Sequence, residues 1–213
     1  MRQLLLSIII CVLLAATTLQ AQTPTAPVRP GVPPDPTTES SNKGEQLTGP
    51  HRYFSDVELV NQNGQKLRFY SDLLKDKIVI ISSFMATCTS ACPAKNSNLE
   101  KIQNFLGQRL GRDVFILSIT VDPVIDTPAR LKEYAKTYHA KPGWHFLSGK
   151  KENVDWALHK IGQYVANKED HVNILVVGNE PTGLWKRSFA LASPAELIKT
   201  VESVINDKPA NPK

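Results

Sequence analysis

Apolar residues form strand-like runs from about residue 53 of the chain onward. The runs at 77–84 (KIVIISSF) and 114–121 (VFILSITV) are almost continuously apolar, which is typical of strands covered on both faces. Shorter runs at 144–148 and 172–178 predict two further strands. The pattern therefore predicts a sheet whose central strands are buried.

Between these runs, apolar residues recur at helical spacing. Leu99, Ile102 and Leu106 share one helical face in the segment that begins at Cys92. Thr127 before Pro128 predicts a capped helix start, because threonine caps well and proline fits the first helical position. We expect four helices, at 92–106, from 128 to about 138, at 153–164 and from a cap at Ser193 to 205.

Two hairpins complete the pattern. Residues 56–70 (DVELVNQNGQKLRFY) predict two short strands around a turn at Asn63-Gly64. Residues 184–191 (LWKRSFAL) predict a last strand after a turn at 179–183. Alternating strands and helices imply a mostly parallel sheet, and the late hairpin implies an antiparallel edge. The predicted class is α/β, with a mixed central sheet flanked by helices.

The first 50 residues have a different composition. A positive start and an apolar stretch from Leu4 to Leu14, with small residues up to Ala21, predict a signal peptide at 1–21. The alternative is an uncleaved membrane anchor. Residues 22–50 hold seven of the 15 prolines among Thr and Ser and predict a linker. We therefore expect an exported, periplasmic domain at 51–208, free or tethered beside a membrane, with a tail at 209–213.

Charge and composition exclude several classes. The chain has 213 residues, 41% of them apolar and 21% charged, which argues against disorder. Its formal net charge of +5 is spread along the sequence without an aromatic-interleaved basic stripe, so we expect no nucleic-acid partner. We also expect a monomer whose mature domain does not insert into a membrane.

The cysteines carry the candidate chemistry. Cys11 would leave with the signal peptide, so the mature domain keeps only Cys88 and Cys92 in the stretch CTSACP. The pair follows a buried strand and enters a helix, where unpaired amides and the helix dipole favour thiolates. A structural disulfide, a redox-active disulfide and a metal site remain open, although so small a loop gives a disulfide little stabilising effect.

A metal site would need a further ligand. Two thiolates under-fill a zinc site, whereas copper(I) accepts soft thiolates and low coordination numbers, and imidazole also suits copper. Four of the five histidines fit surface or core-edge positions; these are His51, His139, His145 and His159. His171 instead opens the strand at 172–178. If that strand runs antiparallel to 77–84, His171 lies at the cysteine end.

Three stretches together resemble the SCO/SenC group of copper-binding, thioredoxin-like proteins that assist cytochrome c oxidase assembly. They are FMATCTSACP, ITVDPVIDTPARLKEYA and EDHVNILVVG, within a likeness that runs from about residue 54 to 205. The resemblance implies a thioredoxin-like fold with an N-terminal β-hairpin. It also implies copper, as Cu(I) or Cu(II), held by Cys88, Cys92 and His171, and an acceptor that is a cytochrome oxidase subunit or another thiol protein.

Two functions follow, and the neighbouring residues bear on both. The first is a copper chaperone; the second is a thiol–disulfide oxidoreductase that uses Cys88 and Cys92 without an obligatory metal. Asp122, Asp126 and Asp170 are candidate groups beside the ligands, although the first two also fit turn and cap chemistry. The loop before residue 171 is short for the group, and the turn GNEPTG at 178–183 departs from its pattern; we expect both departures beside the metal edge.

Overall fold

The computed structural model describes residues 47–208 of the chain. The predicted signal peptide at 1–21, most of the predicted linker at 22–50 and the tail at 209–213 lie outside the described residues. Among the helices that the structure describes, none is long and apolar enough to cross a membrane.

The strands of the described region form one mixed sheet, in the order β2-β1-β5-β4-β3-β6-β7. The central strands β3, β4 and β5 are parallel, whereas β6, β7 and the β1–β2 hairpin pair antiparallel to their neighbours. This confirms the α/β class and both predicted hairpins. The strands are β1 (Glu58–Asn61), β2 (Lys66–Arg68), β3 (Ile78–Phe84), β4 (Val114–Thr120), β5 (Trp144–Gly149), β6 (Ile174–Asn179) and β7 (Leu184–Phe189).

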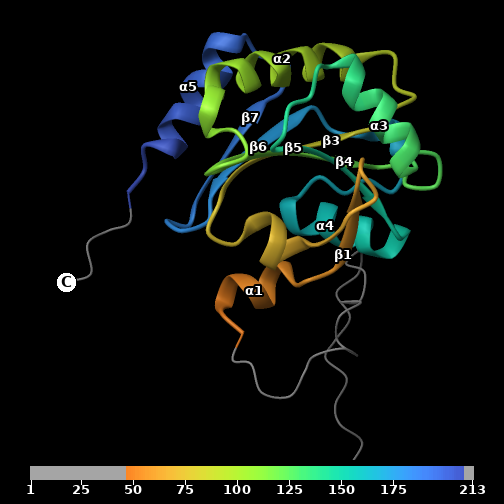
Figure 1. Cartoon of the computed structure of the whole chain (residues 1–213), viewed down its shortest axis with the longest axis horizontal. Coiled ribbons are helices and arrows are strands. Elements are labelled where there is room, and N and C mark those ends of the chain that lie inside the picture. Colours follow the sequence, from red (N-terminus) through yellow and green to blue (C-terminus); the bar gives the residue numbers. More distant parts are fainter. Residues whose placement is uncertain (1–46, 209–213) are drawn as a thin grey trace, which may run out of the picture. The chain divides into compact units, whose positions relative to one another are not determined.

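Helices cover both faces of this sheet (Figure 1). Helices α2, α3 and α5 pack on one face, and α4 with the short α1 packs on the other. Thr127 and Ser193 cap α3 and α5 through their side chains, as their sequence positions predict. The helices are α1 (Gly49–Phe54), α2 (Ala91–Leu106), α3 (Pro128–Thr137), α4 (Lys151–Ile161) and α5 (Pro194–Ile205).

The continuous apolar run of β3 is explained by these two layers. Ile80 and Phe84 point into the core under α2 and α5, whereas Val79 and Ile81 point into the core over α4. Alternate residues of a strand face opposite sides, so a strand covered on both sides has no solvent-facing position. The strand is therefore rigidly held up to the residue where the cysteine loop begins.

Residues 69–74 differ from the sequence prediction. The predicted second strand of the hairpin extended to Tyr70, but β2 ends at Arg68 and a single turn of π-helix spans Phe69–Leu74. The aromatic rings decide this, because Phe69 and Tyr70 are buried and pack against Phe54 of α1. Burial of large rings thus overrides their strand propensity.

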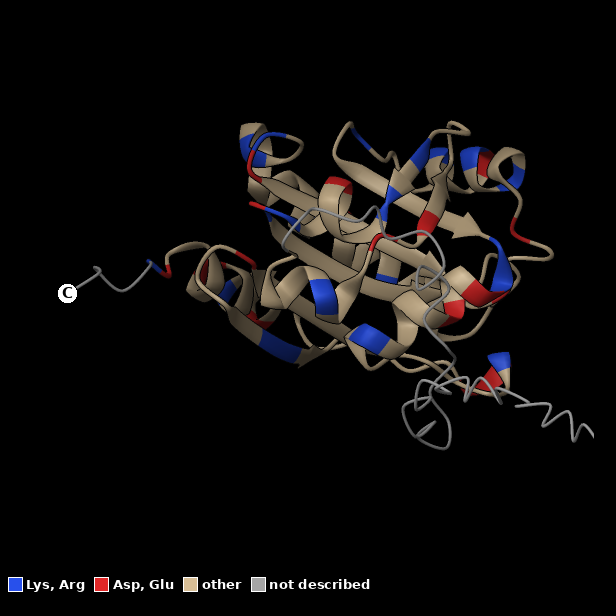
Figure 2. Cartoon of the chain, turned by 90° about the horizontal axis from the view of Figure 1, so that it is seen from below, with Lys and Arg blue, Asp and Glu red and all other residues tan. Residues whose placement is uncertain are grey.

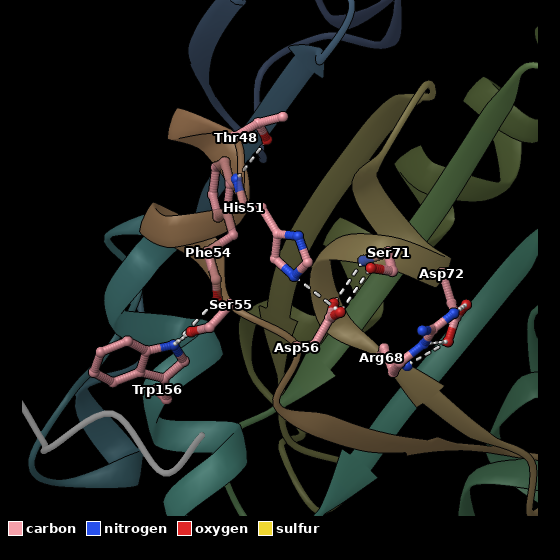
Figure 3. A network of polar contacts seen from close by, with 9 residues as sticks. All are labelled: Thr48, His51, Phe54, Ser55, Asp56, Arg68, Ser71, Asp72 and Trp156. Atoms are coloured by element: carbon pink, nitrogen blue, oxygen red, sulfur yellow. Dashed lines mark hydrogen bonds and ion pairs between the residues drawn. The ribbon is translucent and has the colours of Figure 1, made fainter. Parts of the chain in front are cut away.

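A polar network ties α1 to the body of the domain (Figure 3). The ring of His51 lies 3.0 Å from one carboxylate oxygen of Asp56. That oxygen also accepts a hydrogen bond from the Ser71 hydroxyl, and the other carboxylate oxygen accepts one from the Ser71 amide. The indole of Trp156 in α4 donates to the Ser55 hydroxyl at 2.7 Å. Tertiary contacts, rather than its own length of six residues, hold this helix in place.

The turn at 179–183 lies at the opposite end of the sheet from the cysteines, which corrects the expected location. Asn179 pairs with Ile78, the first residue of β3, and the Glu180 amide donates to the carbonyl of Lys77. The Glu180 carboxylate accepts hydrogen bonds from the Tyr70 hydroxyl and the Asp76 amide, both at 2.9 Å. Strand β6 separates this turn from His171. The departure of residues 178–183 from the pattern of the SCO/SenC group therefore does not lie beside the cysteines.

Candidate metal centre

Both cysteines lie where β3 gives way to α2. Cys88 ends a tight turn in which its amide donates to the Met85 carbonyl at 3.0 Å, and Cys92 is the second residue of α2. Both are free thiols. Cys88 is partly exposed and Cys92 is fully buried, so one sulfur faces the surface and the other faces the core.

The start of α2 is suited to negative charge. Its N-cap residue Ser90 makes no side-chain capping bond, and its first turn contains no acidic residue. The first amides of a helix have no partner within the helix and form the positive end of its dipole. No acidic side chain in the first turn therefore competes with the cysteine sulfurs for this end.

The antiparallel pairing of β6 with β3 brings His171 to the cysteines. The pairing ends at Ser82 and Leu175, so the residues just before β6 lie over the end of β3. The Nε2 atom of His171 is 3.1 Å from the Cys92 sulfur. Within residues 47–208, Cys88, Cys92 and His171 form the only group of three whose ligand atoms suit a metal, all within 4.8 Å of one another.

The imidazole of His171 has a defined orientation. Its Nδ1 lies 2.9 Å from the carbonyl of Lys168. A carbonyl only accepts hydrogen bonds, so this contact places the proton of the neutral ring on Nδ1. The lone pair of Nε2 then faces the sulfur of Cys92, which is the arrangement a metal-ligating histidine requires.

A buried glutamine, which the sequence did not single out, aligns the two strands here. The side chain of Gln163 accepts a hydrogen bond from the Ser83 amide at 2.6 Å and donates to the Ile174 carbonyl at 3.3 Å. It therefore continues the link between β3 and β6 beyond the last backbone pair. This fixes the approach of the His171 segment to the cysteine loop.

Two of the three candidate aspartates hold the loops of the site. Asp126 is fully buried and accepts hydrogen bonds from the Thr120 hydroxyl at 2.5 Å and the Ala86 amide at 3.1 Å. Burial raises the pKa of Asp126 above its ordinary value. Through Ala86 its carboxylate ties the cysteine loop to the loop after β4.

Asp122 ties that same loop to the histidine segment. Its carboxylate accepts a hydrogen bond from the Lys168 ammonium at 2.6 Å, and Lys168 is the residue whose carbonyl orients His171. Asp170 is exposed on the short turn before His171, and among the described residues its carboxylate has no partner. None of the three carboxylates joins the sulfur and imidazole cluster.

Lys95, one turn after Cys92, is also buried. Its ammonium donates to the carbonyl of Ser83, at the end of β3. Burial lowers the pKa of Lys95, and the thiolates of Cys92 and Cys88 act against this lowering. A signal was present in the sequence, because position 95 falls on the apolar stripe of α2 together with Leu99.

The other four histidines have different surroundings. His51 contacts Asp56, His139 lies 2.8 Å from the Glu100 carboxylate, and His159 stacks on Tyr164. His145 lies on β5 away from the cysteines, and burial lowers its pKa. Only His171 meets the cysteine pair.

This donor set suits a soft metal of low coordination number. Two sulfurs and one imidazole nitrogen match the ligand preference of copper, whereas a structural zinc site takes four ligands. Within the described residues, the cluster offers three ligand residues.

Comparison with known sequences identifies relatives over most of the domain. A family model described as SCO1/SenC matches residues 45–205. The chain is 37% identical over 154 residues to a SCO2-like protein of Rickettsia conorii, across 68% of this chain and 73% of the relative. It is 28% identical over 170 residues to a SCO1 protein homolog of Bacillus subtilis, across 76% of this chain and 81% of the relative.

Solved structures show the same architecture. The structure of yeast Sco1 with copper bound matches with a TM-score of 0.60 and 26% sequence identity, over 74% of this chain and 95% of the yeast chain. This likeness confirms the thioredoxin-like fold that the motifs implied.

Proposed function

Since this chain belongs to the SCO1/SenC family, we propose that it is an exported copper chaperone whose metal ligands are Cys88, Cys92 and His171. One observation carries the proposal: sulfur and imidazole donors from two distant segments converge within 4.8 Å. The Nε2 lone pair of His171 already faces a sulfur, so this ligand needs no change of tautomer.

The site combines rigid and accessible ligands. Cys92 is buried on α2, whereas Cys88 and His171 are partly exposed on loops. An incoming thiolate or imidazole of an acceptor can therefore replace the accessible ligands one at a time while Cys92 stays fixed. We propose that the acceptor is a copper-site subunit of cytochrome c oxidase, or another thiol protein.

The proposed location rests on the sequence of the first 50 residues. A cleaved signal at 1–21 would leave the domain in the periplasm with a proline-rich segment at its start, and an uncleaved segment would tether it to the membrane. We propose that the domain is a monomer. The charges of the domain give no support to a nucleic-acid partner. In Figure 2, basic and acidic residues are interspersed over the ribbon.

The experiment is to add stoichiometric copper(II) to the reduced protein and record its absorption spectrum. A thiolate-to-copper charge-transfer band is expected, because a thiolate ligand donates charge to copper(II). The band should be lost in Cys88→Ser and retained in Ser90→Ala, whose hydroxyl lies 3.6 Å from the Cys88 sulfur. Absence of the band in the wild-type protein would reject the proposal.

A second function is favoured by the unequal exposure of the two free thiols. In thiol–disulfide exchange, the accessible Cys88 thiolate would attack one sulfur of a target disulfide and release the other as a thiolate. Cys92 would then attack the Cys88 sulfur, leaving a Cys88–Cys92 disulfide and a fully reduced target. This reaction needs no metal, so it should persist in His171→Ala, whereas copper binding should not.

A further inference from the structure

Lys95 is an unusual residue for its position. Its side chain is 0% exposed and lies near the start of α2, where the helix dipole disfavours positive charge. The structure gives its ammonium one hydrogen bond, to the Ser83 carbonyl, and no carboxylate of the described residues pairs with it. A lysine is almost never fully buried unless a charged partner is present.

The cysteine sulfurs are the groups beside Lys95 that take the opposite charge when they bind a metal as thiolates. Burial lowers the pKa of Lys95, and Cys92 and Cys88 act against this lowering. Cys92 is three residues earlier in α2, so the two side chains project from the same face of the helix. Burying an isolated ammonium is unfavourable, and the metal-bound thiolates of the proposed site would compensate it.

The charge of the proposed site depends on the oxidation state of copper. Two thiolates and a neutral imidazole leave one negative charge around copper(I) and none around copper(II). A fixed positive charge beside the thiolates therefore stabilises the copper(I) form more than the copper(II) form. The same ammonium is uncompensated when the cysteines form a disulfide.

We propose that Lys95 is the counter-charge of the metal site and makes the site selective for copper(I) over copper(II). The proposal rests on the function proposed above and adds a determinant of its specificity. Lys95 is fully buried, and among the described residues no hydrogen bond joins its ammonium to the three proposed ligands. It acts through the electrostatic field that it creates at the sulfurs.

The test measures copper(I) and copper(II) affinities of the full domain by competition with a chromophoric chelator for each ion. Lys95→Met removes the charge and keeps an apolar chain of similar length, and Lys95→Gln removes the charge but keeps a hydrogen-bond donor. Lys101→Met, at an exposed position of the same helix, is the matched control. We expect at least a tenfold loss of copper(I) affinity relative to copper(II) in both Lys95 variants, and none in the control.

That change corresponds to a fall of about 59 mV in the copper potential for each factor of ten. An unchanged affinity ratio in both Lys95 variants would overturn the inference. A changed ratio in Lys95→Met alone would also overturn it, because the hydrogen bond to Ser83 would then be the determinant. If the wild-type protein binds neither ion, the proposed function itself is wrong.

Thermal unfolding of the metal-free proteins separates folding from charge. Removing a buried charge that lacks a carboxylate partner should leave stability equal or higher. If both Lys95 variants are instead strongly destabilised, Lys95 is a structural residue and the inference is overturned.

Discussion

The two ends of the β3–β6 pair are built differently. At the far end, Ile78 pairs with Asn179 through the backbone, and the Glu180 carboxylate satisfies the turns around it. At the cysteine end the backbone pairing of β3 with β6 stops at Ser82, and beyond it side chains make the hydrogen bonds that hold the chain. Gln163 and Lys95 there bind opposite sides of Ser83, through its amide and its carbonyl.

The difference separates what builds the fold from what positions the site. Backbone pairing holds a strand but leaves every residue beyond it free to move. Gln163 and the buried Asp126 extend that order to the loops that bear His171 and Cys88. These side chains are therefore expected to affect metal binding, whereas equivalent changes at the far end should affect stability alone.

Among the residues that support the ligands, the largest expected effect tests this contrast directly. Gln163→Leu leaves the buried Ser83 amide without its partner, which costs about 1–3 kcal/mol of unfolding free energy. It also releases the start of β6, so copper(I) affinity should fall as well. Urea denaturation and chelator competition measure the two effects.

The matched change at the far end is Asn179→Leu. It removes the hydrogen bond from the Asn179 side chain to the Val204 carbonyl, 3.0 Å long and buried. Stability should fall by a similar ~1–3 kcal/mol, while copper affinity stays at the wild-type value. Equal losses of copper affinity in Gln163→Leu and Asn179→Leu would contradict the claim that only the cysteine end of the β3–β6 pair affects metal binding.

A smaller effect is expected at the ion pair beside His171. Lys168→Met removes the 2.6 Å contact with Asp122 but keeps the carbonyl that orients the imidazole. Copper affinity should fall about tenfold, as is usual when a group supporting a ligand is lost. Lys151→Met breaks an ion pair of equal length with Asp155 on α4 and should leave the affinity unchanged. An unaffected affinity in Lys168→Met would show that the pair does not hold the segment.

The smallest effect is a pH dependence at Asp126. Burial raises the pKa of this carboxyl above its ordinary value of 3.8, so its contribution to stability is fully present below that value and is lost as pH rises through the folded pKa. In Asp126→Asn this loss is absent. The stability of the variant relative to wild type should therefore rise from acidic to neutral pH in urea titrations. A difference that falls with pH would show that the charged form is the stabilising one.

The sequence predicted most of the fold because its signals are local. Continuous apolar strands, the caps at Thr127 and Ser193, and the turn at Asn63-Gly64 each depend on near neighbours. Helix α1 and the π-turn at residues 69–74 were not predicted, since both depend on aromatic packing between distant segments. The location of the turn at 179–183 was wrong, because a strand's direction decides which loops share an end of the sheet.

The sequence predicted the three ligand residues of the candidate site but not the buried residues that surround them. Cys88, Cys92 and His171 carry recognisable donors, and the antiparallel β6 brings them together. Gln163 and Lys95 are polar residues of kinds that usually face solvent. Their roles come from burial against Ser83, which requires α2 and the segment after α4 to pack on β3. For Lys95 the sequence held one signal, its position on the apolar stripe of α2.

The copper(I) affinity of His171→Ala tests the central claim most directly. The matched control is His139→Ala, whose side chain is 78% exposed and contacts Glu100 on the protein surface. Competition with a copper(I) chelator should show a loss of roughly 100-fold or more for His171→Ala, beyond what supporting residues contribute, and no change for His139→Ala. Wild-type affinity in His171→Ala would contradict the three-ligand site.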